Sequence, residues 1–381
     1  MKIVYIYTAL LTQGGVDRVL SVKANYLADH LGHDVWIITD SQAGRPVVFP
    51  LSPQVHHIDL ETDFDEQYHN GIIRRFMIYR RLMRQYRKRL KAKLNEIRPD
   101  IVCTTLGRDM DFLCDLHDGS RKVGESHIAK AFCRNFHLME ARGFPYKQIA
   151  RYWRWKQERS VAKLDALVVL TQRDAASWSD VRKAQVIHNP CTIVPTGRAD
   201  VVKSRTVVAV GRLGEQKAFH RLIAAWSKVA PLHPEWQLCI WGEGELHIDL
   251  QNQISELGLT ASVHLYGISH NIEDCYQQGA FYAMTSRFEG FPLVLIEAMS
   301  CGLPLVAMDC PTGVREIVND GENGLLVPDG DIEAMSSALC RMIESPSLRS
   351  SMSKRCLKIV EDRFCLPAVM NKWEKLFESL M

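Results

Sequence analysis

The chain has 381 residues, with 47 Lys and Arg against 44 Asp and Glu, and 46% of its residues are hydrophobic. This composition excludes disordered, collagen-like and disulfide-stapled chains, and the length predicts two domains of about 150 residues or more each. The first 190 residues hold 30 basic and 21 acidic side chains, whereas the remaining residues hold 17 and 23. The basic half favours an anionic partner, either membrane phosphates or nucleic acid.

The eleven cysteines are scattered without a C-x-x-C pair, which predicts reduced and mostly buried thiols. The apolar residues 3–11 are followed at once by Gly14 and Gly15 instead of a cleavage site, so no secretory signal is expected. No apolar run reaches the roughly 18–20 residues that span a bilayer. We therefore expect a cytoplasmic protein, at most peripheral to the inner face of the cell membrane.

Residues 1–190 predict a parallel sheet covered by helices. A strand at 3–7, the glycine turn, apolar helical spacing over 19–31 and a strand at 35–39 form a βαβ unit. Further strands are expected at 100–104, 166–170 and 186–188.

Residues 191–205 contain Pro195 and Gly197 and lack periodicity, so they are the expected linker. A second series of helices and short apolar strands follows, with strands expected at 206–210, 237–241, 262–266, 281–284 and 304–307. The fold class expected is therefore α/β, with two Rossmann-like domains whose parallel sheets face a cleft between them.

The segment 287–302 carries two glutamates, Glu289 and Glu297, eight positions apart. Pro292 suits the first turn of a helix and Gly302 its end, which puts Glu289 in the loop before the helix and Glu297 inside it. The amides at the helix start are suited to bind an anion. Such a platform fits a nucleotide diphosphate sugar. The alternative for Glu297, a solvated helix face, is weakened by its apolar surroundings.

The segment 210–222 follows a strand and opens a helix. Arg212 offers a fork for phosphate oxygens, Lys217 adds a point charge, and Gly211 and Gly214 permit close approach of a ligand. The spacing of a Walker loop is absent. An ordinary strand-to-helix turn with surface cations is the alternative.

These motifs together resemble retaining glycosyltransferase family 4, of the GT-B fold, and in particular its bacterial cell-surface polysaccharide members. The resemblance spans nearly the whole chain, and its motifs are Gly14-Gly15-Val16-Asp17-Arg18, Gly211-Arg212-Leu213 with Lys217, Gly242-Glu243-Gly244, and the pair Glu289 and Glu297. It implies an acceptor-binding domain at 1–190, a nucleotide-sugar domain at 206–362, and a helix at 363–381 that crosses back to the first domain.

On the donor side, the resemblance implies that Arg212 and Lys217 stabilise the diphosphate and that Glu297 holds the ribose. Glu289, with the amides of Gly290 and Phe291, contacts the transferred sugar. Gly242 completes this predicted site.

In the first domain, Gly14 and Gly15 place a helix N-terminus against the phosphates, and Asp17 stands where the family more often has Glu. His127 resembles a histidine that reaches the donor sugar near the reacting centre. The alternative for His127 is a satisfied surface or core histidine.

The resemblance also implies transfer of a hexose or N-acetylhexosamine, with retention at the anomeric carbon, to a glycan acceptor that is lipid-linked. The departing diphosphate itself acts as base, so neither a cofactor nor an essential metal is expected. The preferred donor is a UDP-sugar, because residues 309–313 look like the polysaccharide-synthesising members. The sequence feature that argues for a metal is Asp109-Met110-Asp111, a D-x-D of the kind that holds a divalent cation in other glycosyltransferase folds.

Residues 74–93 contain ten basic side chains and no acidic one, with apolar residues at helical spacing. This helix is expected either to dock on anionic lipid or to pack on its own sheet with a solvated cationic face. A basic aromatic stretch at 151–156 has the same two interpretations.

Two other classes of function compete. A nucleic-acid-binding protein would use these cationic surfaces but leaves the two glutamates without a role. An NAD-dependent dehydrogenase has Rossmann-like halves, but His247 stands where the dinucleotide fingerprint beginning at Gly242 needs a small residue.

Overall fold

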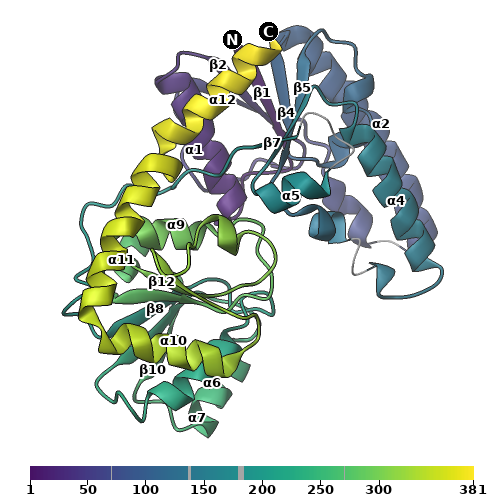
Figure 1. Cartoon of the computed structure of the whole chain (residues 1–381). Coiled ribbons are helices and arrows are strands. Elements are labelled where there is room, and N and C mark those ends of the chain that lie inside the picture. The colour runs from purple at the N-terminus through teal and green to yellow at the C-terminus, as the bar shows by residue number, and fades with distance from the viewer. Residues whose placement is uncertain (70, 136–138, 179–183, 270) are drawn as a thin grey trace. The chain divides into compact units, whose positions relative to one another are not determined.

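A computed structural model of the chain describes residues 1–69, 71–135, 139–178, 184–269 and 271–381 (Figure 1). These residues form two compact units, one of Met1–Ile187 with Met370–Met381 and one of His188–Val369. The sequence had suggested divisions near residues 190 and 363. Both units are α/β with a parallel sheet, so the expected fold class of two Rossmann-like domains is confirmed.

The first unit is built on a seven-stranded parallel sheet of order β3-β2-β1-β4-β5-β6-β7. Its strands are β1 (Lys2–Tyr7), β2 (Asp34–Thr39), β3 (Val55–Asp59), β4 (Ile101–Thr104), β5 (Arg121–Ser126), β6 (Ala166–Val169) and β7 (Ala184–Val186). The strand expected at 186–188 lies two residues earlier. Two strands were missed because β3 carries His and Asp at half-exposed positions, and β5 buries the charged residues Lys122 and Glu125.

Helices cover both faces of this sheet, with α1 and α12 on one face and α2 and α4 on the other (Figure 1). The helical segments are α1 (Gly15–Asp29), η1 (Phe64–His69), α2 (Ile72–Ile97), η2 (Arg108–Asp111), η3 (Leu113–Asp115), η4 (Lys130–Asn135), α4 (Tyr146–Val161), α5 (Gln172–Ser177) and α12 (Leu366–Leu380). The basic helix α2 buries Leu82, Tyr86, Leu90 and Leu94 against the sheet, as its four-residue spacing predicts. Among the described helices, none is long and apolar enough to cross a membrane.

The helix α12 completes the first unit from Met370 onward. Trp373 is buried, and the Nζ atom of Lys23 on α1 lies 3.6 Å from its ring centroid. The Nε2 atom of His33 lies 2.8 Å from a carboxylate oxygen of Glu374. Residues from the far end of the chain therefore form part of the core of the first unit.

The second unit has a six-stranded parallel sheet of order β10-β9-β8-β11-β12-β13. Its strands are β8 (Thr206–Val210), β9 (Gln237–Trp241), β10 (Val263–Tyr266), β11 (Phe281–Met284), β12 (Leu305–Met308) and β13 (Gly324–Val327). Its helical segments are α6 (Phe219–Val229), α7 (His247–Glu256), α8 (Ile272–Gln277), α9 (Leu293–Ser300), η5 (Val314–Glu316), α10 (Ile332–Glu344), α11 (Pro346–Ile359) and η6 (Val360–Phe364). The strand β13 was not predicted from the sequence, because Gly324–Val327 is a short run of four residues that follows a turn.

In both sheets the order in which strands are added reverses beside the first strand. This switch point lies between β1 and β4 in the first unit and between β8 and β11 in the second. In open α/β sheets, ligands bind outside the carboxyl ends of the strands at this switch point. The loops after these four strands are therefore the places where each unit is built to bind a ligand.

Candidate active site

The loops after β8 and β11 meet at the switch point of the second unit. The Gln216 side chain donates to the carbonyl oxygen of Phe288 at 3.1 Å, and the Arg287 amide donates to the Gln216 carbonyl at 2.8 Å. The two loops that hold the predicted donor residues are thus joined by one side-chain and one backbone hydrogen bond.

Lys217 and Glu289 form the central contact of this site, with Nζ and Oε1 2.7 Å apart. Their side chains are only 18% and 8% exposed. The loop after β12 fixes Glu289, because its amide donates to Pro311 and its carbonyl accepts from the Thr312 amide at 2.8 Å. The structure therefore brings together two predicted site residues that lie 72 positions apart in the sequence.

Arg212 lies on the same loop as Lys217 but points to the surface. Its side chain is 77% exposed and its Nη2 atom lies 3.1 Å from a carboxylate oxygen of Glu245. The guanidinium is therefore a solvated cation at the edge of the site, with further donors available to a phosphate.

Gly242 is required by a close approach of two backbones. Its φ of +141° is in the region that favours glycine, and a Cβ atom there would lie 2.0 Å from the carbonyl oxygen of Gly211. Hydrogen bonds from Leu213 to Glu243 and from Leu246 back to Leu213 extend this contact. Gly242 thus lets its backbone pack directly against the 211–217 loop.

Glu297 lies on α9 with its carboxylate buried and already hydrogen-bonded. The Thr192 hydroxyl donates to Oε1 at 2.8 Å, and the Tyr276 hydroxyl donates to Oε2 at 3.0 Å. Burial, followed by the Glu297 charge, raises the pKa of Tyr276 well above its usual value, so Tyr276 remains a donor. A carboxylate oxygen is able to accept hydrogen bonds from more than one donor.

The residues before α9 form a packed turn. The helix begins at Leu293, so Pro292 is its N-cap and lies one position before the first turn in which the sequence placed it. The Phe291 ring is buried and stacks on His188 at 5.4 Å between centroids, so the ring itself is not available to a ligand. A Cβ atom at Gly313 would lie 2.3 Å from the Gly290 carbonyl oxygen, which shows how closely the loop after β12 covers this turn.

In the first unit, Gly14 and Gly15 open α1 at the β1 switch point. Gly14 is the N-cap, in an extended conformation, and both glycines are exposed. Asp17 is buried and accepts from the Tyr7 hydroxyl at 2.6 Å and from the Thr12 amide at 2.8 Å. The shorter Asp therefore still anchors the loop that leads into the helix.

His127 follows β5, and its side chain is only 7% exposed. Its Nε2 atom lies 3.4 Å from a carboxylate oxygen of Glu125, which also binds the Lys23 ammonium at 2.5 Å. Burial lowers the pKa of His127, so the ring is neutral at pH 7. Burial by itself would raise the pKa of Glu125, but Lys23 and His127 together hold it below its usual value. With Glu125 facing Nε2, the Nδ1 atom is left as the acceptor.

Several residues of these sites were not predicted. They are Thr192 and Tyr276 beside Glu297, Glu245 beside Arg212, and Glu125 and Lys23 beside His127. Only Glu125, two positions from His127 in a strand whose side chains alternate, carried a signal in the sequence.

The D-x-D residues do not gather a metal site in the described part of the chain. Asp109 is buried, while Asp111 lies 3.4 Å from the Lys156 ammonium. Among the described residues, no group of three or more His, Cys, Asp or Glu side chains is placed to hold a metal ion.

Residues 198–358 match the family model described as "Glycosyl transferases group 1". This range holds β8 to β13 and the predicted donor residues of the second unit. The expected enzyme class, a glycosyltransferase, is therefore confirmed for this part of the chain.

Two of the relatives found are named as glycosyltransferases. An "Uncharacterized glycosyltransferase" of Haemophilus influenzae is 32% identical over 218 residues, which is 56% of this chain and 62% of that protein. A Campylobacter jejuni protein named GalNAc-alpha-(1->4)-GalNAc-alpha-(1->3)-diNAcBac-PP-undecaprenol alpha-1,4-N-acetyl-D-galactosaminyltransferase is 27% identical over 100% of this chain and 99% of its own length. The match to the first of these thus leaves more than a third of that relative uncovered.

The crystal structure of Anabaena HepE in complex with UDP has the same fold, with a TM-score of 0.73 over 100% of both chains at 17% identity. The likeness to this structure confirms the GT-B architecture. Neither the dehydrogenase nor the nucleic-acid alternative gains support from the comparisons.

Proposed function

We propose that this chain is a retaining glycosyltransferase of family 4 that transfers a hexose or N-acetylhexosamine from a UDP-sugar to a lipid-linked glycan. The observation that carries this proposal is the Lys217–Glu289 pair at the β8–β11 switch point, inside the matched glycosyltransferase range. The UDP bound by HepE supports the choice of nucleotide. The undecaprenol and the alpha linkage in the name of the Campylobacter protein support a lipid-linked acceptor and retention.

Lys217 is the main cation for the donor diphosphate in this proposal. An ammonium has three N–H donors, so Lys217 is able to hold Glu289 and a phosphate oxygen together. Glu289 in turn keeps Lys217 in one position and presents its second oxygen to a sugar hydroxyl. Arg212, exposed beside it, closes on the diphosphate from solvent.

Charge grows on the nucleotide diphosphate as the sugar leaves it. Fixed cations and the amides at the start of α9 stabilise that charge better than water does, because they need no reorganisation during the reaction. Glu297, held by Thr192 and Tyr276, is oriented in advance to accept hydrogen bonds from the ribose. The leaving diphosphate then takes the proton of the acceptor hydroxyl as the acceptor attacks from the same face.

The first unit supplies the acceptor side of the proposal. Residues of this unit are also assigned to the donor in the proposal. His127, neutral and with a buried Nδ1 that has no hydrogen-bond partner among the described residues, is assigned to the donor sugar, and Gly14 and Gly15 at the start of α1 are assigned to the donor phosphates. A lipid-linked acceptor requires work at a membrane surface, and we propose the inner face of the cell membrane. The cationic helix α2 is consistent with this location.

A thermal-shift panel tests the donor site. UDP-, GDP- and ADP-sugars, free UDP and NAD are added in the presence of a chelator to the wild type, to Lys217→Ala and to Lys228→Ala. Lys228 is a matched control because it lies on α6, away from the loop, and forms a surface ion pair with Glu333. We expect UDP compounds to stabilise the wild type and the control but not Lys217→Ala. Stabilisation by NAD alone would overturn the proposal.

The anomeric outcome is tested by proton NMR of the product. A UDP-sugar of alpha configuration should give an alpha-linked product, whereas a beta-linked product excludes retention.

A further inference from the structure

The start of α4 exposes an unusual concentration of large apolar side chains. Every residue from 141 to 149 is exposed, and Phe144 reaches 85%. Four more exposed large apolar side chains follow within the next eleven positions, namely Tyr146, Ile149, Tyr152 and Trp155. Single exposed apolar residues are normal on a protein surface, but a concentration of this kind marks an interaction site.

The same segment is strongly cationic. Residues 141–157 include five basic side chains and no acidic one. Arg154 and Lys156 form ion pairs within the first unit. Lys147 and Arg151 are exposed, and in the described residues neither has a carboxylate partner. The surface therefore combines apolar rings with uncompensated positive charge.

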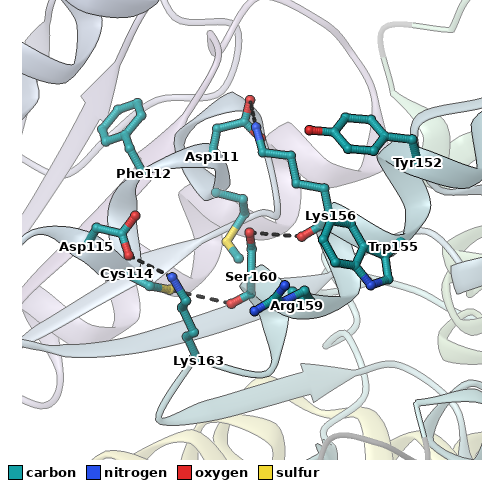
Figure 2. A pocket seen from close by; sticks show the side chains of 11 residues that line it. Asp111, Phe112, Cys114, Asp115, Tyr152, Trp155, Lys156, Arg159, Ser160 and Lys163 are labelled. Carbon is teal, nitrogen blue, oxygen red and sulfur yellow. Dashed lines mark hydrogen bonds and ion pairs between the residues drawn. The ribbon is translucent and has the colours of Figure 1, made fainter. Parts of the chain in front are cut away.

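A pocket of about 280 Å³ lies beside this segment, between α4 and the turns η2 and η3 (Figure 2). Tyr152, Trp155 and Arg159 line it from α4. The Arg159 guanidinium lies 4.9 Å from the Trp155 ring centroid, which holds it in place by a cation–π contact.

The acidic groups of the pocket are already neutralised. Asp111 pairs with Lys156 at 3.4 Å, and Asp115 pairs with Lys163 at 2.8 Å. Arg159 has no carboxylate partner among the described residues, so the excess charge of the pocket is positive and lies on this guanidinium. An anion of the size of a phosphate group fits such a site.

We propose that residues 142–159 dock the first unit onto an anionic phospholipid bilayer, with the exposed rings in the headgroup region and Arg159 binding a headgroup phosphate. Trp and Tyr are the residues that settle at this depth, and a helix with cations beside exposed rings lies in the plane of the interface. This inference deepens the proposed function, because it names the surface that would meet a lipid-linked acceptor.

The other cationic helix, α2, is less suited to carry this contact alone. Arg81 is held by both carboxylate oxygens of Glu66, and Arg89 donates to the backbone carbonyls of Leu60 and Glu61. Part of its charge is therefore committed within the unit. We place the principal contact on α4.

Co-sedimentation with vesicles tests the proposal. The full chain should bind vesicles of equimolar phosphatidylcholine and phosphatidylglycerol and should not bind phosphatidylcholine alone. Each cation near an anionic surface contributes about a fivefold factor in partitioning, so Lys147→Gln with Arg151→Gln should weaken binding about 25-fold. A matched control, Lys354→Gln with Lys358→Gln, removes the same charge from α11 and should change little.

Two further variants separate the two parts of the surface. Phe144→Ser leaves the charge unchanged and should weaken binding about tenfold, because an inserted ring is lost. Arg159→Gln should weaken it about fivefold, through the pocket. Thermal unfolding checks that each variant keeps the wild-type stability.

Equal binding to both vesicle types, or an equal loss in the α11 control, would overturn the docking surface. So would binding of duplex RNA or DNA through Lys147 and Arg151 by a protein that ignores vesicles. UDP titration of the same variants is a separate readout: if vesicles bind but UDP does not, the proposed function fails and the docking surface stands.

Discussion

The Lys217–Glu289 pair gives the sharpest prediction for the second unit. Removing either partner leaves a mostly buried charge without its counter-ion. A charge-assisted hydrogen bond contributes about 1.5–3 kcal/mol, and the 18% exposure of Lys217 favours the lower end. We expect Lys217→Met and Glu289→Gln each to lower the free energy of unfolding by about 2 kcal/mol.

The double variant should lose less than the sum of the two single losses, because it leaves no unpaired charge. A coupling energy of about 1–2 kcal/mol is expected. Urea unfolding followed by circular dichroism measures all four proteins, and a UDP titration in parallel reports the donor site. Losses that add within about 0.5 kcal/mol would refute the idea that the two side chains support each other.

Gly242→Ala should lower the free energy of unfolding by about 3 kcal/mol or more, since its Cβ would lie 2.0 Å from a carbonyl oxygen. The control Gly258→Ala, with open space around it, should cost about 1 kcal/mol. Urea unfolding measures both losses, and equal losses would contradict this expectation. Burial raises the pKa of Asp40 to about 6 from 3.8, so its contribution to stability is present at low pH and is lost as the pH rises through 6. Asp40→Asn should therefore match the wild type near pH 4 and exceed it by about 2 kcal/mol at pH 7 in melts across this range, and an unchanged pH profile would count against the assignment. Lys23→Met should cost about 3–5 kcal/mol because Glu125 stays buried with only the neutral His127 ring beside it, and a wild-type melting temperature in this variant would show that the pair is not a stabilising one.

Regular periodicity made most of the fold predictable from the sequence. The strands at 206–210, 237–241 and 281–284 agree with β8, β9 and β11, because short apolar runs between turns are typical of buried strands in a parallel sheet. Strands that carry charge were missed, because Lys122 and Glu125 become compatible with a buried strand only through Asp118 and Lys23, and the distance in sequence hides the second pairing.

The candidate site was partly predictable for the same reason. Glycine spacing and cations after a strand located the 211–217 loop, but no local pattern says that Lys217 meets Glu289 or that Tyr276 binds Glu297. Those contacts depend on which strands are neighbours, and the β8–β11 adjacency joins segments about seventy residues apart. The roles of these residues in catalysis stay predictions.

The contribution of α12 to the first unit has a consequence for synthesis on the ribosome. Residues 1–187 leave the ribosome long before Trp373, which covers Lys23 in the finished unit. Until Trp373 has been made, the Lys23 ammonium and the apolar surface around it, which are buried in the finished unit, are exposed to water. The second unit is continuous from 188 to 369, so its synthesis is complete before the last residues of the first unit are made. The first unit is therefore begun first but is the last to have all the residues of its fold. A chain released before residue 370 would carry a first unit with an exposed core, a form that cellular proteases recognise readily.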